Sequence, residues 1–298
     1  MANEFPGTLL EFERWFRTEQ SCQDFLERLR WPKGFVCPEC ERGPAWRTKS
    51  GMFYCQACHA ITSVTAGTVF HRSKIPLRLW YRAIWWMTNQ KMGINAMGLQ
   101  RLLGLPSYQT AWTMLHKLRR AMVRPGREEL TGDVEVDETL VGGLRPGNHA
   151  RNARNIVIIA AEIRGEGIGR IRLAKLPDDK TPTIVNFVKK NVAKGSRIVS
   201  DGAWAYCSLG LGYRHRRLPG AGSKELPRVH RVASLIKRWI LGTFQGRASD
   251  EQLEHYLDEF AFRFNRRNSA SRGQLFYRLV QQCAGRAATP YRAMISSV

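Results

Sequence analysis

Residues 134–141 read Val-Glu-Val-Asp-Glu-Thr-Leu-Val, with Asp137 at the centre of an alternating apolar and polar stretch. Such alternation predicts a β-strand with one buried face. The run Ile156-Val-Ile-Ile-Ala-Ala161 predicts a buried strand, and residues 169–176 alternate again. We therefore expect three consecutive strands in the middle of the chain.

The stretch after these strands mixes helix and strand patterns. Residues 181–192 predict an amphipathic helix, residues 197–200 a fourth strand, and the sequence from about Pro227 onward further helices. Three strands, a helix, a strand and terminal helices together predict an α/β layer fold.

The residues before the strands are mostly helical in period. Residues 8–30 and a segment opened by Pro76 carry apolar side chains three and four positions apart. Residues 93–120 predict a short and a longer helix joined by a turn at residues 104–107, the shape of a helix-turn-helix with a basic second helix. A plain helical linker bundle is the alternative interpretation.

Four of the seven cysteines form two CxxC knuckles, Cys37-Pro-Glu-Cys40 and Cys55-Gln-Ala-Cys58. This spacing predicts four thiolates around one tetrahedral zinc ion, with no position left for a catalytic water. Such a site can supply roughly 10–16 kcal/mol to a module too small for its own core. The adjacent His59 is a possible substitute ligand, but we expect it to lie at the surface.

The charge balance points to a polyanionic partner. The 298 residues include 47 Lys and Arg against 25 Asp and Glu, a formal charge of +22, spread from end to end. Double-stranded DNA would offset this charge, with salt-sensitive binding. We see no secretion signal or membrane-spanning stretch, and the odd cysteine count favours a reducing compartment. The expected location is the bacterial cytoplasm, in association with the nucleoid.

Two aspartates lie where an unpaired charge would be costly. Asp137 lies inside an apolar strand, and Asp201 ends Arg197-Ile-Val-Ser-Asp201. On adjacent strands they would form an oxygen-lined site for magnesium, and a structural salt bridge is the alternative for either alone. Asp133 and Glu135 share the strand face of Asp137; one could shape the site, but we expect both to be solvated.

The zinc knuckles and several longer motifs together resemble the zinc-ribbon group of bacterial insertion-sequence transposases. The motifs are Val136-Asp-Glu-Thr-x-x-Gly142-Gly143, Ser200-Asp-Gly-Ala-Trp204, Ile236-Lys-Arg-Trp239, Gly242-Thr243 and residues 256–267. The resemblance implies a ribonuclease H-like core whose Asp-Asp-Glu triad binds two divalent ions, Mg²⁺ or Mn²⁺. It also implies that water cuts DNA, that the freed 3′-hydroxyl attacks target DNA, and that a homo-oligomer holds the element ends.

The third acid of that triad is missing from its expected place. Lys237 fits the basic position that commonly follows it by seven residues, and counting back gives His230. On a helix, His230, Ser234 and Lys237 would share one face. Imidazole suits manganese better than magnesium, so we expect weak metal binding and better activity with manganese. Glu138 and Glu259 are rival ligands.

The predicted chain is thus a multidomain α+β protein. The expected domains are N-terminal helices (1–33), a zinc ribbon (34–72), a helix-turn-helix-like region (76–124), a ribonuclease H-like catalytic domain (130–270) and a C-terminal tail (271–298). The expected catalytic residues are Asp137, Asp201, His230 and Lys237, of which the first three would bind metal. The expected DNA contacts are Lys117, Arg119, Arg120, Lys237, Arg238, Arg266 and Arg267. Phe260, Phe262 and Phe264 are expected in the core.

Three functions fit these observations. The first is an active transposase that binds the terminal inverted repeats of its element and cuts and joins DNA. The second is a sequence-specific DNA-binding protein with a degenerate catalytic site. The third is another metal nuclease of the same fold. Both aspartates and Lys237 are intact, which favours the first.

Overall fold

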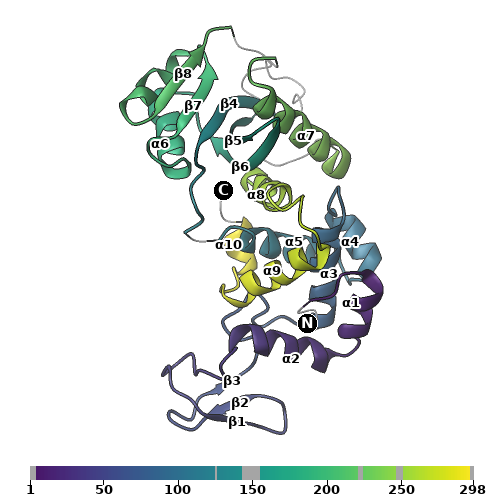
Figure 1. The fold of residues 1–298 in the computed structure, drawn as a ribbon. Helices are drawn as coiled ribbons and strands as arrows, with labels where there is room; N and C mark the ends of the chain where they lie inside the picture. The colour runs from purple at the N-terminus through teal and green to yellow at the C-terminus, as the bar shows by residue number, and fades with distance from the viewer. Residues whose placement is uncertain (1–4, 125, 143–154, 221–223, 246–250, 296–298) are drawn as a thin grey trace. The chain divides into compact units, whose positions relative to one another are not determined.

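The chain divides into two compact units, each described separately below (Figure 1). The computed structural model describes residues 5–124, 126–142, 155–220, 224–245 and 251–295, so Gly143 of the expected Gly142-Gly143 turn lies outside the described residues. One unit comprises Met1–Met122 with Ser269–Val298, and the other comprises Val123–Asn268. Within the described ranges, no helix has both the length and the apolar character that crossing a bilayer requires.

The first unit is a helical assembly around an aromatic core. Its helices are α1 (Leu9–Trp15), α2 (Glu19–Arg30), α3 (Leu77–Asn89), α4 (Ala96–Leu103), α5 (Tyr108–Ala121), α9 (Arg272–Ala284) and α10 (Tyr291–Ile295). The ring centroid of Phe16, the residue that follows α1, lies 5.0 Å from that of Tyr81 on α3 and 5.4 Å from that of Phe276 on α9. Residues 271–298, expected as a tail, therefore contribute a core helix to this unit.

The pair α4 and α5 forms around the predicted turn. Gly104 ends α4 in the left-handed region, at φ +61°, where a glycine carries no steric penalty. Ser107 begins α5 because its hydroxyl accepts a hydrogen bond from the backbone N–H of Thr110 at 3.1 Å. The short helix, the turn and the longer helix are present where the pattern predicted them, an arrangement common to a helix-turn-helix and to a plain helical bundle.

The cysteine-bearing module of this unit is a small antiparallel sheet. Its strands are β1 (Ala45–Arg47), β2 (Phe53–Cys55) and β3 (Ile61–Thr62), in the order β1-β2-β3. Phe35 stacks on Phe53 with ring centroids 4.8 Å apart, which gives the module a minimal apolar centre. A sheet this small depends on a further staple.

The second unit is built on a five-stranded mixed sheet of order β6-β5-β4-β7-β8. The strands are β4 (Asp133–Val141), β5 (Asn155–Arg164), β6 (Gly167–Leu176), β7 (Arg197–Asp201) and β8 (Arg214–Leu218). β4, β5 and β6 are antiparallel neighbours, whereas β4, β7 and β8 run parallel. The three strands predicted in series and the fourth at residues 197–200 are all present.

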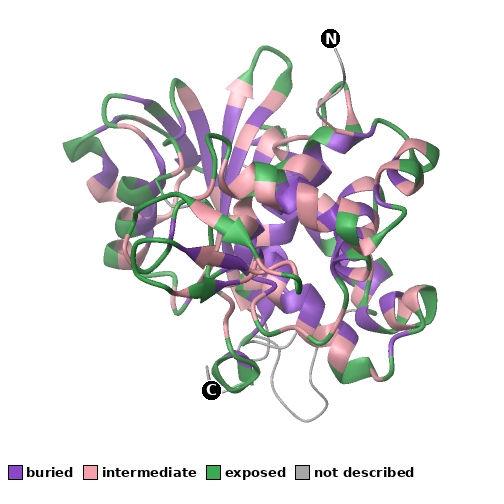
Figure 2. Ribbon diagram, turned by 90° about the horizontal axis from the view of Figure 1, so that it is seen from below, coloured by how far each residue is buried: buried purple, intermediate pink, exposed green. Residues whose placement is uncertain are grey.

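Helices cover both faces of this sheet. One face packs against α7 (Pro227–Phe244) and α8 (Leu253–Phe264), and the other against α6 (Thr181–Asn191) and the 3₁₀ segment η1 (Trp204–Leu211). In Figure 2 the buried residues follow the strands and the inward faces of the helices. The three phenylalanines of α8 are buried, as expected. The predicted fold class is confirmed: a zinc-ribbon module followed by a sheet domain with C-terminal helices.

The alternation of β4 decides which side chains reach which helices. Val134 and Val136 enter the core with α6, while Val141 enters the core with α7 and α8. Since successive side chains of a strand point to opposite faces, Glu135 and Asp137 lie on the α7 face.

Candidate functional site

The four cysteine sulfurs of the first unit converge. Cys37 Sγ lies 3.6 Å from Cys58 Sγ, Cys40 Sγ lies 3.7 Å from Cys55 Sγ, and all four lie within 4.8 Å of one another. Four thiolates about 2.3 Å from a tetrahedral zinc ion would be separated by about 3.8 Å. The quartet therefore fits one structural zinc ion.

The turn that follows Cys55 favours the thiolate of this residue. Backbone N–H groups of Cys58 and Ala57 lower the pKa of Cys55 to about 7, and only the thiolate form binds metal. His59 is turned away to a different partner, because its Nδ1 lies 2.8 Å from the hydroxyl of Tyr54. His59 thus lies at the surface, as expected, and the ligand set is Cys₄.

Asp137 and Asp201 come together in the second unit. β4 and β7 are parallel neighbours whose register pairs Glu135 with Val199. Asp137 and Asp201 each follow this pair by two residues, so both lie on the same face of the sheet, toward α7. The charge of Asp201 acts directly on Asp137.

The site is electrostatically strained when it lacks cations. Burial, and then the negative charge of Asp201, raise the pKa of Asp137 from 3.8 to about 6. The side chain of Asp137 is 18% exposed, and a backbone N–H of Glu138 donates to its Oδ1 at 2.9 Å. The backbone N–H of Ala203 likewise donates to Asp201 Oδ1 at 3.0 Å. These neutral donors do not cancel two negative charges on one face, so the pair favours an added positive charge.

His230 faces Asp137 from α7. Its Nε2 lies 3.6 Å from Asp137 Oδ2, and among the described residues this buried nitrogen has no hydrogen-bond partner. A buried polar atom without a partner is costly. Carboxylate oxygens beside a free imidazole nitrogen form a donor set that suits Mn²⁺ or another divalent ion, so the residues fit the implied cofactor.

The placement of His230 depends on Glu135, which was expected to be solvated and is instead 1% exposed. Its Oε2 accepts the backbone N–H groups of Arg228 at 2.7 Å and Val229 at 3.0 Å, and its Oε1 lies 3.2 Å from Arg228 Nη1. A carboxylate at a helix N-terminus satisfies orphan N–H groups and complements the helix dipole. Glu135 thus ties the first turn of α7 to the strand that carries Asp137.

The two rival ligands are engaged elsewhere. Glu138 lies on the opposite face of β4, where its Oε2 accepts the hydroxyl of Tyr206 from η1. Glu259 is fully buried on α8, and its Oε1 lies 3.4 Å from Arg263 Nη2. Asp133, the other acid at the start of β4, pairs with Arg197 of β7.

The basic residues of α7 and α8 differ in availability. Lys237 and Arg238 are exposed on α7. Arg266 lies over the ring of Phe262 at 4.0 Å. Arg267 donates to the carbonyls of Ile168 and Gly169, which secures the end of the sheet. The α7 pair is therefore the more accessible to a phosphate backbone.

The basic residues of α5 differ from expectation. Arg119 is 1% exposed and its Nη1 lies 3.3 Å from His116 Nε2, so its guanidinium is directed into the unit and is not available to DNA. Lys117 and Arg120 are half-buried, and burial lowers the pKa of each. The exposed part of α5 is its first turn, with Tyr108 and Gln109.

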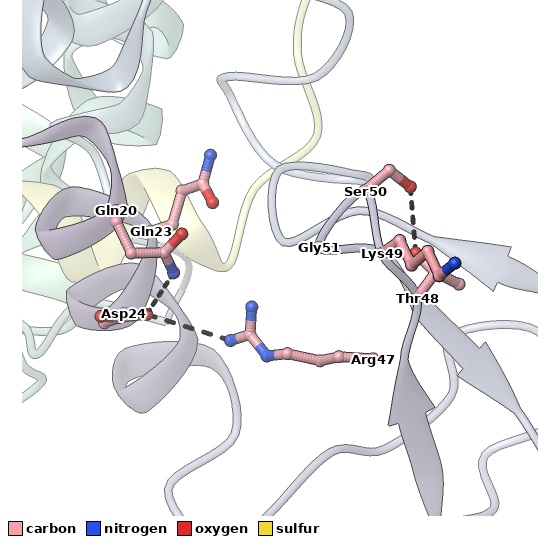
Figure 3. Close-up of a pocket in the computed structure, with 8 residues that line it drawn as sticks. All are labelled: Gln20, Gln23, Asp24, Arg47, Thr48, Lys49, Ser50 and Gly51. Carbon is pink, nitrogen blue, oxygen red and sulfur yellow. Dashed lines mark hydrogen bonds and ion pairs between the residues drawn. The ribbon is translucent and has the colours of Figure 1, made fainter.

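A pocket of the first unit contains none of the predicted site residues. It lies between α2 and the turn after β1, and Figure 3 shows its polar lining. Gln20 donates to Asp24 at 2.8 Å, and Arg47 lies 4.0 Å from the same carboxylate. These groups already pair with one another, so the pocket offers little unpaired chemistry.

Two family models match parts of this chain. Residues 129–265 match the ISXO2-like transposase domain, and residues 17–60 match the transposase zinc-ribbon domain. The chain therefore has segments similar to both domains of this group, and the resemblance drawn from its motifs is confirmed.

Two individual proteins are also similar. An "uncharacterized protein in transposable element ISH50" from Halobacterium salinarum is 30% identical over 135 residues, which is 44% of this chain and 45% of that protein. The match thus spans less than half of the curated relative. A chain of the simian T-cell lymphotropic virus intasome in complex with PP2A regulatory subunit B56 gamma aligns at a TM-score of 0.31 and 13% identity, covering 60% of this chain and 70% of that one.

Proposed function

We propose that this protein is a DNA transposase that binds the terminal inverted repeats of its element and catalyses DNA cleavage and strand transfer with divalent metal ions. The observation that carries the proposal is that Asp137 and Asp201 share one face of the sheet and that His230 Nε2 lies 3.6 Å from Asp137 Oδ2. The zinc ribbon and the α4–α5 pair would recognise DNA. The protein would act as a homo-oligomer on double-stranded DNA, in the bacterial cytoplasm.

Asp137, Asp201 and His230 would hold Mg²⁺ or Mn²⁺, which when bound activates an attacking oxygen and stabilises the leaving one. The oxygen of water attacks a DNA phosphorus, the bond to the 3′-oxygen breaks, and that oxygen takes a proton. The freed 3′-hydroxyl then loses its proton and bonds to a phosphorus of the target strand, the P–O3′ bond of that phosphodiester breaks, and the leaving 3′-oxygen takes a proton. Lys237 and Arg238 would bind the flanking phosphates and hold the strand in position.

The test is strand cleavage and joining of a labelled element end by the full chain in Mg²⁺ or Mn²⁺. We expect Asp137→Asn and Asp201→Asn each to lower the cleavage rate at least ~10³-fold while DNA binding persists, because the metal site loses a charged ligand. Asp179→Asn, on an exposed residue of the same unit, is the matched control. Wild-type protein that binds the ends but cuts nothing in either metal would instead support the degenerate DNA-binding protein.

The role of His230 has its own test. We expect His230→Ala to lower cleavage about 10–100-fold and His230→Glu to shift the preference from Mn²⁺ toward Mg²⁺, since carboxylate is the harder ligand. Cleavage by His230→Ala at the wild-type rate would remove His230 from the metal site. The Asp137 and Asp201 results would be unaffected by that outcome.

A further inference from the structure

The edge strand of the catalytic sheet is strongly basic. β8 reads Arg214-His-Arg-Arg-Leu218 and pairs in parallel with β7, from Arg197↔Arg214 to Asp201↔Leu218. It is the last strand in the sheet order, so its outer edge has no partner strand among the described residues. The strand that bears Asp201 is thus bordered by a row of positive charges.

Two of these arginines lie on the face of the carboxylate site. Register partners on neighbouring strands share a face, so Arg214 lies beside Arg197 and Arg216 lies beside Val199. Val199 and Leu218 belong to the core under α7 and α8, which identifies the face. Arg214 and Arg216 are nevertheless exposed, because the helices do not cover this edge.

The distances suit a path that leads to the aspartates. With strands about 4.8 Å apart and a rise of about 3.3 Å per residue, the Cα of Arg216 lies about 8 Å from that of Asp201, and the Cα of Arg214 about 14 Å. Arg214 and Arg216 therefore lie one after the other along a line that ends at the candidate metal site.

Within the part of the chain that the structure describes, Arg214 and Arg216 lack the carboxylate partners that other arginines have. Other arginines of the sheet have carboxylate partners, such as Arg197 with Asp133 and Arg170 with Glu162. No carboxylate among the described residues pairs with Arg214 or Arg216. Adjacent unpaired cations on one face repel each other, and a polyanion relieves that repulsion.

We propose that Arg214 and Arg216 form a phosphate track that binds the DNA backbone and leads it to the Asp137–Asp201 site. The proposal rests on the proposed function and adds a DNA-contact surface to it. The contact is to phosphate and not to bases, because guanidinium groups on an open sheet edge meet a backbone without entering a groove. Charged residues can also protect an edge strand from pairing with other chains, but that role requires no particular face.

The experiment compares Arg214→Gln/Arg216→Gln with Lys189→Gln/Lys190→Gln in the full chain. The control removes two equally exposed charges from α6, on the opposite face of the sheet. The probe is a fluorescent duplex of mixed sequence, titrated over a range of salt concentrations. A plot of the logarithm of the DNA association constant against the logarithm of salt concentration has a negative slope. Relative to wild type, we expect the arginine variant to reduce the magnitude of this slope by about 2 and the affinity about tenfold, while the control changes neither. Arg214→Lys/Arg216→Lys should restore the slope.

Equal slopes for the two glutamine variants would overturn the proposal, as would aggregation of the arginine variant with unchanged binding by its monomeric fraction. Cleavage by the wild-type protein separates this proposal from the proposed function. If the wild-type protein cleaves DNA but the arginine variant has the wild-type slope, only the phosphate track is contradicted. If the arginine variant has a smaller slope but the wild-type protein does not cleave DNA, the phosphate track stands and the transposase activity is contradicted.

Discussion

The two candidate metal centres of this protein are built in opposite ways. The cysteine quartet draws four ligands of one chemical type from residues 37–58, and all of its sulfurs lie within 4.8 Å of one another. The carboxylate centre draws its ligands from β4, β7 and α7, and its His230 side chain is 37% exposed. A zinc ion whose four positions are all filled by thiolates has a structural role. A cation held by fewer protein ligands at a sheet keeps positions open for a substrate.

Removal of one cysteine should produce the largest effect. We expect Cys40→Ser to lower zinc content from about one ion per chain to none and to unfold the β1–β3 module, because a site worth roughly 10–16 kcal/mol is lost. Metal analysis and limited proteolysis within residues 34–72 measure this. Cys207→Ser, at a half-buried cysteine of the second unit, is the control. Stoichiometric zinc in Cys40→Ser would show that the quartet is not the zinc site.

Sequence patterns predicted the parts of both centres that depend on local chemistry. The spacing of the cysteines predicted the two knuckles, and the alternating residues around Asp137 predicted β4. The short apolar run before Asp201 was sufficient to predict β7. In each case the signal lies within a few residues of the ligand, so no knowledge of distant contacts was required.

The features that escaped prediction depend on contacts between distant residues. β8 has Leu218 as its single apolar residue, and it is a strand because it pairs with β7, not because of its own pattern. Glu135 looked like a solvated strand-start residue because its hydrogen-bond donors lie more than ninety residues away, at Arg228 and Val229. Burial of Arg119 likewise reflects the packing of α5, which the count of basic residues did not reveal.

The second test of the contrast between the two centres concerns Glu135, because the carboxylate centre requires His230 to be held in position. We expect Glu135→Gln to destabilise the protein by about 1–3 kcal/mol and to weaken Mn²⁺ binding several-fold. The neutral amide loses the negative charge at the N-terminus of α7, and it replaces the oxygen that faces the Arg228 guanidinium with an NH₂ group. Thermal unfolding measures the first effect, and Mn²⁺ titration at a temperature where the chain stays folded measures the second.

Glu166→Gln removes an equal charge from an exposed turn of the same unit and should change neither quantity. A Glu135→Gln protein that loses stability but binds Mn²⁺ as the wild type does would make Glu135 a purely structural residue. Zinc content should stay constant in both variants, because the quartet shares no residue with this centre.

The smallest effect should come from the charge of Asp137 in metal-free protein. Its folded-state pKa of about 6 exceeds the ordinary 3.8, so the unfolded chain releases the proton first as pH rises. The wild type therefore loses stability between about pH 4 and pH 6, and the loss persists above that range. Asp137→Asn removes the penalty, and we expect it to be more stable than wild type by on the order of 1 kcal/mol at pH 7, allowing for solvent screening, and equal to it near pH 4. Added Mn²⁺ should reverse the order at pH 7, because bound cations stabilise only the chain that retains the carboxylate. A variant less stable than metal-free wild type at pH 7 would mean that Asp137 is stabilised by a protein partner, and the contrast between a closed staple and an open, cation-dependent site would fail at its central residue.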